Sequence, residues 1–336
     1  MKKRYLLDCT LRDGGYVNDW AFGHDNIVQI FEHLASAGTD IIEIGFLDER
    51  RPFDLHRSIM PDTDSADRFL QGLHKRSAMV VGMIDYGTCS LEHVRPCQES
   101  LLDGIRVIFK KHLMHPAMQF CAELKKLGYQ VFAQLVSVTS YSDMEMLELI
   151  QLANEIQPFA VSMVDTYGLM HPENLLHFFR LLDKNLAFGI CLGFHAHNNF
   201  QMGYANCIAM LSNQSERSLI VDGTVYGMGK SAGNAPLELL MMHLNRTYGG
   251  HYDINPVLEL MQDMIPQFYQ PPTWGYSLPY YLSALHECHP NYVAYLMSKQ
   301  DLSVCTVNEI LGQITEERKL CYDHSYAETL YYSHIT

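Results

Sequence analysis

The chain has 336 residues and a mass of 38.5 kDa, enough for one large domain or for a large domain with a smaller appendage. Hydrophobic residues make up 48% of the sequence and charged residues 18%, a composition that excludes an intrinsically disordered protein. The 24 Lys and Arg residues and 38 Asp and Glu residues give a net charge of −14. This acidic balance argues against nucleic acid and anionic membrane as partners.

Nine cysteines are scattered along the chain without a Cys-x-x-Cys pair. Such a distribution predicts reduced, buried thiols in a cytoplasmic protein rather than a disulfide framework or a zinc finger. The longest segment without an acidic or basic residue, 185–215, contains several His, Asn and Gln residues. No bilayer span tolerates that density of polar groups, so no membrane association is expected.

Short apolar, β-branched segments alternate with helical patterns from the N-terminus to about residue 247. Strands are predicted over residues 5–9, 41–46, 78–83, 105–110, 129–135, 159–164, 188–194 and 219–222. Helices are predicted between them over residues 26–36, 66–74, 91–98, 116–127, 144–155, 172–182, 202–211 and 236–246, the third being only a weak pattern. Continuous apolar strands alternating with amphipathic helices predict a parallel sheet covered on its outer face.

Eight such units in about 250 residues predict an α/β protein with a (β/α)8 TIM barrel. A doubly wound open sheet is the alternative, and it would place a glycine fingerprint at the first turn. Residues 8–15 have the sequence DCTLRDGG instead, which favours the barrel. After residue 250 the chain is rich in proline and aromatic residues, followed by helical patterns. We therefore expect a catalytic barrel domain over residues 1–250 and a helical C-terminal domain over 251–336.

Polar residues occur at or just after the predicted strands, where a barrel enzyme carries its active site. Arg12 and Asp13 follow the first strand, Glu43 lies within the second, and Asp165 follows the sixth. Glu43 is a candidate for holding Arg12 by a charge-assisted pair, and Asp165 for orienting a ligand or relaying a proton. For both residues a structural ion pair at the barrel rim is the alternative.

His195 and His197 lie at the end of the seventh predicted strand. In an extended segment residues i and i+2 point to the same side, so the two imidazoles face one point. A His-x-His pair alone is often coincidental, but its position at a strand end beside other polar residues favours a metal site. Two imidazoles and one carboxylate leave room for a bidentate substrate on Mn, Mg, Zn or Fe(II).

The segment 221–238 invites a nucleotide-binding interpretation that its spacing does not support. A phosphate-binding loop ending at Gly229-Lys230-Ser231 needs glycine at position 224, which is Thr224. The glycines also follow the last strand, so they cannot open a dinucleotide-binding βαβ unit. We expect a flexible loop whose backbone amides approach an anionic substrate group and in which Asn234 offers its amide oxygen to a metal.

Five motifs together resemble the metal-dependent barrel lyase and synthase superfamily, also called HMG-CoA lyase-like or DRE-TIM. They are DCTLRDGG at 8–15, IEIGF at 42–46, DTYG at 165–168, HAHN at 195–198 and the glycine-rich segment 227–234. They recur in family order over about two-thirds of the chain. The resemblance implies that Asp13, His195 and His197 bind a divalent cation, with Asn234 as a fourth ligand, and that Arg12 stabilises an enolate oxygen.

Within this superfamily the sequence is most similar to 4-hydroxy-2-oxovalerate aldolases, which share the glycine-rich loop and a helical C-terminal appendage. The hydroxymethylglutaryl-CoA lyases carry a catalytic cysteine in that loop, and this chain has none there. The aldolases also place a histidine shortly after the Arg-Asp-Gly motif, where this chain continues Gly15-Tyr16-Val17-Asn18. Tyr16, or Tyr276 or Tyr280 from the appendage, is a candidate to replace that acid or base.

The resemblance implies a lyase that cleaves or forms a C–C bond next to a 2-oxo acid such as pyruvate, through a metal-bound enolate. Mn or Mg is the expected cofactor, with Zn or Fe(II) as alternatives. The expected partners are a small-molecule 2-oxo acid substrate, an aldehyde dehydrogenase and further copies of the chain in a homo-oligomer. The alternative functions are an acyl-CoA-condensing synthase of the same superfamily and a non-catalytic barrel subunit.

Overall fold

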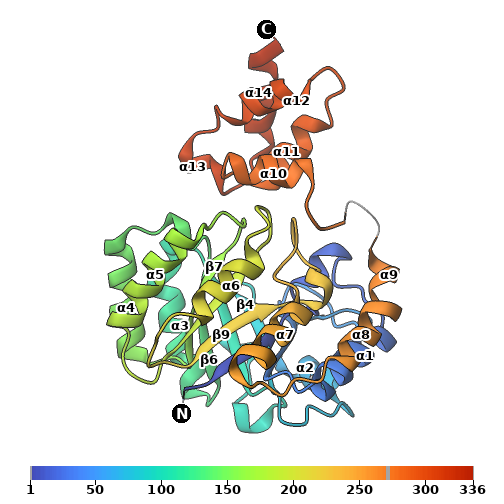
Figure 1. The fold of residues 1–336 in the computed structure, drawn as a ribbon, viewed down its shortest axis with the longest axis vertical. Coiled ribbons are helices and arrows are strands. Elements are labelled where there is room, and N and C mark those ends of the chain that lie inside the picture. The colour runs from blue at the N-terminus through green and yellow to red at the C-terminus, as the bar shows by residue number, and fades with distance from the viewer. Residues whose placement is uncertain (1, 270–272, 336) are drawn as a thin grey trace.

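The computed structural model describes residues 2–269 and 273–335 and confirms the predicted barrel (Figure 1). Eight parallel strands pair in the order β1-β9-β8-β7-β6-β5-β4-β2, and β2 pairs with β1 to close the sheet. The barrel strands are β1 Arg4–Asp8, β2 Ile41–Leu47, β4 Met79–Asp85, β5 Gly104–Phe109, β6 Gln130–Leu135, β7 Ala160–Asp165, β8 Cys191–Ala196 and β9 Leu219–Gly223. A further two-residue strand that the sequence did not predict, β3 Ile59–Met60, pairs with the end of β2.

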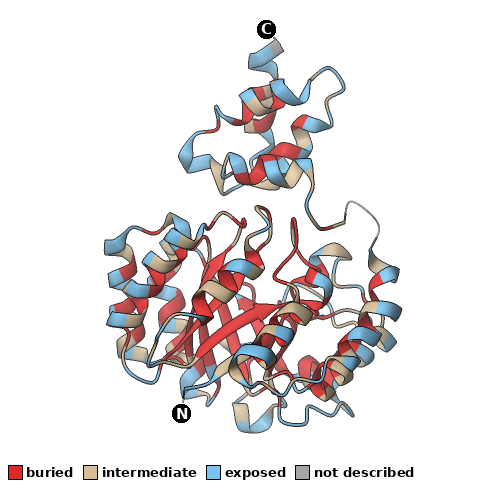
Figure 2. Cartoon of the chain, in the orientation of Figure 1, coloured by how far each residue is buried: buried red, intermediate tan, exposed pale blue. Residues whose placement is uncertain are grey.

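Helices cover the outside of the barrel and hide its apolar outer face (Figure 2). They are α1 His24–Ser36, α2 Thr63–Leu70, α3 Met114–Lys126, α4 Asp143–Ile156, α5 Pro172–Asn185, α6 Gly203–Leu211 and α7 Leu237–Tyr248. The predicted helix at 91–98 is wrong: it forms two short 3₁₀ turns, Leu91–His93 and Cys97–Glu99. Pro96 lies between them in an extended conformation, which interrupts the helical hydrogen bonds.

The barrel interior consists of an apolar layer below a polar one. Ile41, Phe132, Ala160 and Ile220 belong to a buried cluster on four different strands. Two residues further along the same strands lie Glu43, Gln134, Ser162 and Asp222, all buried. Because side chains two apart on a strand point to the same side, these polar groups form the next layer toward the C-terminal strand ends. The period of the strands therefore directs charged groups to the end where barrel enzymes carry their sites.

After the barrel the chain continues in helices α8 Asn255–Asp263 and α9 Ile265–Phe268, which share the core of the barrel. The last helices, α10 Leu278–Leu285, α11 Pro290–Met297, α12 Val304–Leu311, α13 Glu316–Lys319 and α14 His324–Ile335, have a core of their own (Figure 2). The domain division at residue 250 stays a prediction. Among the described residues, no helix is long and apolar enough to cross a bilayer.

This second helical unit lies over the C-terminal ends of the barrel strands (Figure 1). The Tyr167 hydroxyl, just after β7, donates to the Leu320 carbonyl at 3.1 Å. The Asn199 side-chain amide, just after β8, donates to the Tyr280 carbonyl at 3.3 Å. The helical unit therefore covers the face of the barrel toward which the polar layer points.

Candidate metal centre

Three of the predicted metal ligands converge at the mouth of the barrel. Asp13 comes from the loop after β1, His195 from the end of β8, and His197 directly follows that strand. The Nε2 atoms of the two histidines are 3.3 Å apart, and His197 Nε2 lies 3.9 Å from Asp13 Oδ2. All three side chains are buried, and their ligand atoms lie within 4.8 Å of one another.

The protonation of the two imidazoles fits a cation between them. His195 Nδ1 lies 3.1 Å from Asp222 Oδ2, and His197 Nδ1 lies 3.2 Å from the Lys230 carbonyl oxygen. Both acceptors place the proton on Nδ1, so both Nε2 atoms carry a bare lone pair. Burial lowers the pKa of His197 to about 4, which keeps its ring neutral although Asp13 acts in the opposite direction. Two bare lone pairs 3.3 Å apart repel each other unless a cation lies between them.

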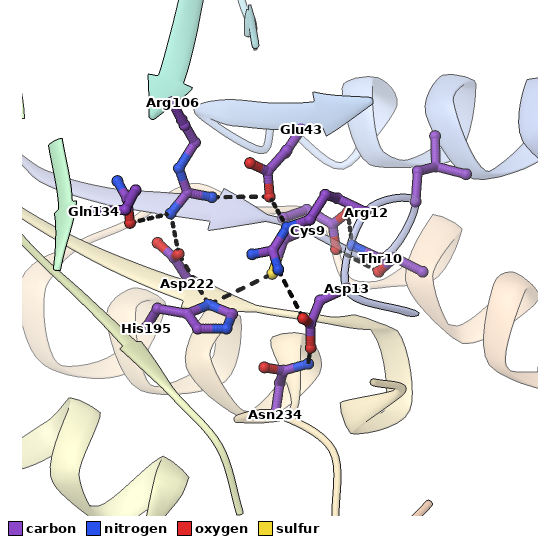
Figure 3. Close-up of polar contacts among 12 residues, drawn as sticks. Cys9, Thr10, Arg12, Asp13, Glu43, Arg106, Gln134, His195, Asp222 and Asn234 are labelled. Atoms are coloured by element: carbon purple, nitrogen blue, oxygen red, sulfur yellow. Dashed lines mark hydrogen bonds and ion pairs between the residues drawn. The ribbon is translucent and has the colours of Figure 1, made fainter. Parts of the chain in front are cut away.

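Asn234 and Asp13 complete an oxygen-rich half of the site (Figure 3). The Asn234 side-chain nitrogen donates to Asp13 Oδ2 and to the Met228 carbonyl, whereas its Oδ1 oxygen is buried without a hydrogen-bond partner. Burial opposes ionisation of Asp13, but the Arg12 charge and the two histidines hold its pKa well below the usual range. An anionic carboxylate, an unpaired amide oxygen and two imidazole nitrogens are a suitable donor set for Mn²⁺ or Mg²⁺.

The glycine-rich loop between β9 and α7 packs so closely against this site that side chains at some of its glycine positions would clash. A Cβ atom on Gly229 would come within 2.0 Å of the Asn234 side-chain nitrogen and 2.6 Å of Asp13 Oδ2. Gly233 has a φ of +81°, and a Cβ there would lie 2.0 Å from the Gly227 carbonyl oxygen. The loop was expected to be flexible, but most of it is buried. The backbone amide of Asn234 donates to the Gly227 carbonyl at 3.0 Å. Close packing therefore holds Asn234 against Asp13.

Arg12 is fixed by two carboxylates (Figure 3). Its Nε donates to Glu43 Oε2 at 2.8 Å, and its Nη1 donates to Asp13 Oδ1 at 2.7 Å. The predicted pairing of Glu43 with Arg12 is therefore present in the structure. Among the described residues no hydrogen bond involves Nη2, so this donor is free for a ligand oxygen beside the metal ligands.

A second buried arginine, which the sequence analysis did not single out, links the two halves of the polar layer. Arg106 from β5 lies 2.9 Å from Glu43 Oε2 through Nη1, and its Nη2 contacts Asp222 and Gln134. Although burial opposes it, Arg106 lowers the pKa of Asp222, so the carboxylate is ionised beside His195. The sequence did contain a sign of these two residues, because Arg106 and Asp222 are charged residues within strands that are otherwise apolar. Only the closed barrel brings β5 and β9 together with β2, which carries Glu43.

Asp165 does not join this cluster. Its carboxylate accepts hydrogen bonds from the Leu169 and Met170 backbone amides at 2.8 and 3.0 Å, which shapes the loop after β7. Burial nevertheless raises its pKa to about 7. Its backbone carbonyl accepts from the His197 amide at 3.4 Å. Asp165 therefore supports the position of His197 through the backbone.

Tyr16 lies at the rim of the site. Its ring packs edge-on against Trp20 and Phe46, with centroids 4.9 and 6.2 Å apart, while 43% of the residue stays exposed. Burial of the hydroxyl end and the nearby Asp13 charge raise the pKa of Tyr16, so the hydroxyl keeps its proton at neutral pH. Of the two appendage tyrosines, Tyr280 lines a cavity together with Lys230, whereas Tyr276 is 63% exposed.

Comparison with known proteins finds similarity over most of the chain. The model of the HMGL-like family matches residues 3–262. The 4-hydroxy-2-oxovalerate aldolase of Pseudoalteromonas translucida is 26% identical over 80% of this chain and 78% of its own length. The oxaloacetate decarboxylase of Mycobacterium tuberculosis is 26% identical over 82% of each chain.

Solved structures share the fold. The hydroxymethylglutaryl-CoA lyase of Pseudomonas aeruginosa superposes with a TM-score of 0.65 at 15% identity, covering 81% of this chain and 95% of that chain. The carboxyl transferase domain of Rhizobium etli pyruvate carboxylase superposes with a TM-score of 0.67 at 14% identity, covering 89% of this chain and 53% of that chain.

Proposed function

Since the chain belongs to the HMGL-like family, we propose that it is a divalent-metal-dependent lyase acting on the C–C bond next to a 2-oxo acid, as in 4-hydroxy-2-oxovalerate cleavage. The observation that carries the proposal is the meeting of two bare imidazole nitrogens with Asp13 and the unpaired Asn234 oxygen, beside Arg12. The proposal includes a small-molecule 2-oxo acid as substrate, and an aldehyde dehydrogenase and further copies of the chain as protein partners.

In this proposal Asp13, His195, His197 and Asn234 hold Mn²⁺ or Mg²⁺. The bound metal supplies Lewis-acid polarisation of the 2-oxo acid. Breaking the C3–C4 bond leaves its electron pair on C3 as an enolate, and the 4-hydroxyl loses its proton to solvent water as it becomes the aldehyde oxygen. The free Nη2 of Arg12 stabilises the negative oxygen of the enolate, and Glu43 and Asp13 fix the guanidinium in advance. In this proposal Tyr16, which keeps its proton at neutral pH, gives a proton to C3 and regains one from solvent.

The test is solvent deuterium exchange into the methyl group of pyruvate, followed by NMR with Mn²⁺ or Mg²⁺ present. We expect the wild type to exchange these protons and His195→Ala to lose exchange, because the metal has lost a ligand. His177→Ala is the matched control, since His177 lies on α5 in an exposed pair with Asp143. A protein that binds the metal but leaves pyruvate protons unexchanged would contradict the proposal.

Reaction type is tested separately by supplying 4-hydroxy-2-oxovalerate, oxaloacetate, or acetyl-CoA with pyruvate. Formation of pyruvate from 4-hydroxy-2-oxovalerate supports the aldolase. Turnover of oxaloacetate alone indicates a decarboxylase, the activity named for one relative. Release of CoA indicates the condensing alternative. Absence of all three together with absence of bound metal indicates a non-catalytic barrel subunit.

A further inference from the structure

A cavity of about 380 Å³ lies between the glycine-rich loop and the helical unit that covers the barrel. Its barrel side is formed by Lys230 and Ser231. Its other side is formed by α10, α11 and the adjoining loops, including Tyr280, His289 and Asn291. The volume suits a small metabolite rather than a macromolecule.

Lys230 connects this cavity with the metal ligands. Its backbone amide donates to Asp13 Oδ2 at 3.4 Å, and its carbonyl oxygen lies 3.2 Å from His197 Nδ1. The backbone of Lys230 is therefore fixed directly beside the proposed metal centre, and the same residue lines the cavity. The ammonium lies 5.3 Å from the centroid of the Tyr16 ring.

Within the described part of the chain, the Lys230 ammonium forms no ion pair within 4.0 Å. Asp13 and Asp85 act on it electrostatically without contacting it as ion-pair partners. Lys230 is only partly exposed, so its side chain has lost part of its hydration. The chain has a net charge of −14, yet no carboxylate pairs with this cation in the described residues. Burying an unpaired charge costs free energy, so the position of Lys230 needs an explanation.

Two further residues near Lys230 favour a negatively charged ligand: Lys110 adds positive charge and His289 adds a hydrogen-bond donor. The charge of Lys110, whose Nζ donates to Cys321 Sγ at 3.5 Å, acts on His289 together with that of Lys230. His289 Nδ1 accepts from the Asn291 amide at 3.2 Å, which places the ring proton on Nε2 as a donor. The helical unit therefore supplies a neutral donor residue to the lining of the same cavity as Lys230.

We propose that Lys230 binds a second carboxylate on the substrate, so that the preferred 2-oxo acid is a dicarboxylate whose distal end lies in the cavity below α11. This inference rests on the proposed function for the binding of the 2-oxo acid end at the metal. The distal carboxylate replaces the hydration that the ammonium lost, and His289 donates a further hydrogen bond to it. Substrate length is then set by the separation of the metal ligands from Lys230.

The test compares two unreactive probes of equal chain length, 2-oxoglutarate and 2-oxovalerate, binding to the Mn²⁺-loaded full chain in calorimetry. We expect 2-oxoglutarate to bind the wild type roughly 10-fold to 100-fold more tightly, the factor that a charge-assisted hydrogen bond contributes. In Lys230→Met this preference should fall to nearly one, and Lys230→Arg should restore most of it. His289→Gln, which keeps a donor near the position of Nε2, should retain more of the preference than His289→Ala.

Lys126→Met is the matched control, because it removes one positive charge from the end of α3, where exposed Lys126 pairs with Glu123. Its preference for 2-oxoglutarate should equal that of the wild type. A wild-type preference near one, or a preference that survives in Lys230→Met, would overturn the assignment of Lys230. Loss of pyruvate exchange in the wild type instead contradicts the proposed function, so the two failures are distinguishable.

Discussion

Asp222 Oδ2 lies 3.1 Å from His195 Nδ1, and the same oxygen contacts the Arg106 guanidinium (Figure 3). The carboxylate thereby sets the tautomer and orientation of His195, a proposed metal ligand. Arg106 in turn keeps Asp222 ionised. The proposed metal site therefore has His195, Asp222 and Arg106 linked across three different strands, β8, β9 and β5.

Replacing Asp222 with Asn should weaken Mn²⁺ binding about 10-fold to 100-fold, the usual cost of removing such a supporting carboxylate. The amide oxygen can still accept from His195, but it lacks the negative charge that raises the basicity of Nε2. Calorimetric titration with Mn²⁺ measures the effect, and circular dichroism checks that the variant is folded. Unchanged Mn²⁺ affinity in a folded variant would show that His195 is held by its surroundings alone.

Arg12→Ala should lower the rate of pyruvate proton exchange by ~10²–10³, by analogy with removal of a single oxyanion donor. The enolate would then lose the donor that Glu43 and Asp13 hold in place. Arg12→Lys keeps the charge but cannot bond both carboxylates in the same geometry, so an intermediate rate is expected. A wild-type rate in Arg12→Ala, measured with saturating metal, would exclude the role.

Metal binding should stabilise the folded protein, because the ligands converge only in the folded barrel. At a free metal concentration 100-fold above the dissociation constant, the free energy of unfolding should rise by about 2.7 kcal/mol. Thermal melts with Mn²⁺ and with a chelator measure the difference. In His195→Ala/His197→Ala the melting temperature should no longer respond to Mn²⁺, whereas a response equal to that of the wild type would place the metal elsewhere.

Asp8 predicts a pH dependence of stability. Burial raises its pKa from 3.8 to about 7, although it accepts two hydrogen bonds from Thr10. Below pH 3.8 the carboxyl is protonated in both states, and between that value and about 7 the unfolded chain releases its proton first. Asp8 therefore costs the wild type stability as pH rises through this window, by at most about 1.4 kcal/mol per pH unit.

The measurement compares urea unfolding of the wild type and Asp8→Asn at several pH values between 5 and 8. The difference in free energy of unfolding should move in favour of the Asn variant as pH rises toward 7 and then level off. The comparison cancels the contributions of the other carboxylates. A difference independent of pH would mean that Asp8 titrates in the folded protein as it does in the unfolded chain.

Local sequence was sufficient to predict the barrel and the meeting of Asp13, His195 and His197 at its mouth. The alternation of apolar strands and helices depends on side-chain period, and His195 and His197 share a face because of their spacing. The predicted helix at 91–98 was wrong because Pro96 acts against a weak apolar pattern. Asp165 was expected near the metal ligands because it follows a predicted strand. In the structure its carboxylate instead accepts hydrogen bonds from the Leu169 and Met170 backbone amides, a local contact that strand-end position does not reveal.

The tertiary structure decided which residues support the site. Arg106, Asp222 and Glu43 lie on β5, β9 and β2, and no local pattern pairs residues so far apart in sequence. Closure of the barrel brings these strands around one interior, where an unpaired buried charge would be costly and each charged group is therefore paired. Likewise, only the packing of the last helices over the barrel mouth places His289 opposite Lys230. Side-chain period acts over a few residues, whereas these contacts depend on how distant segments pack.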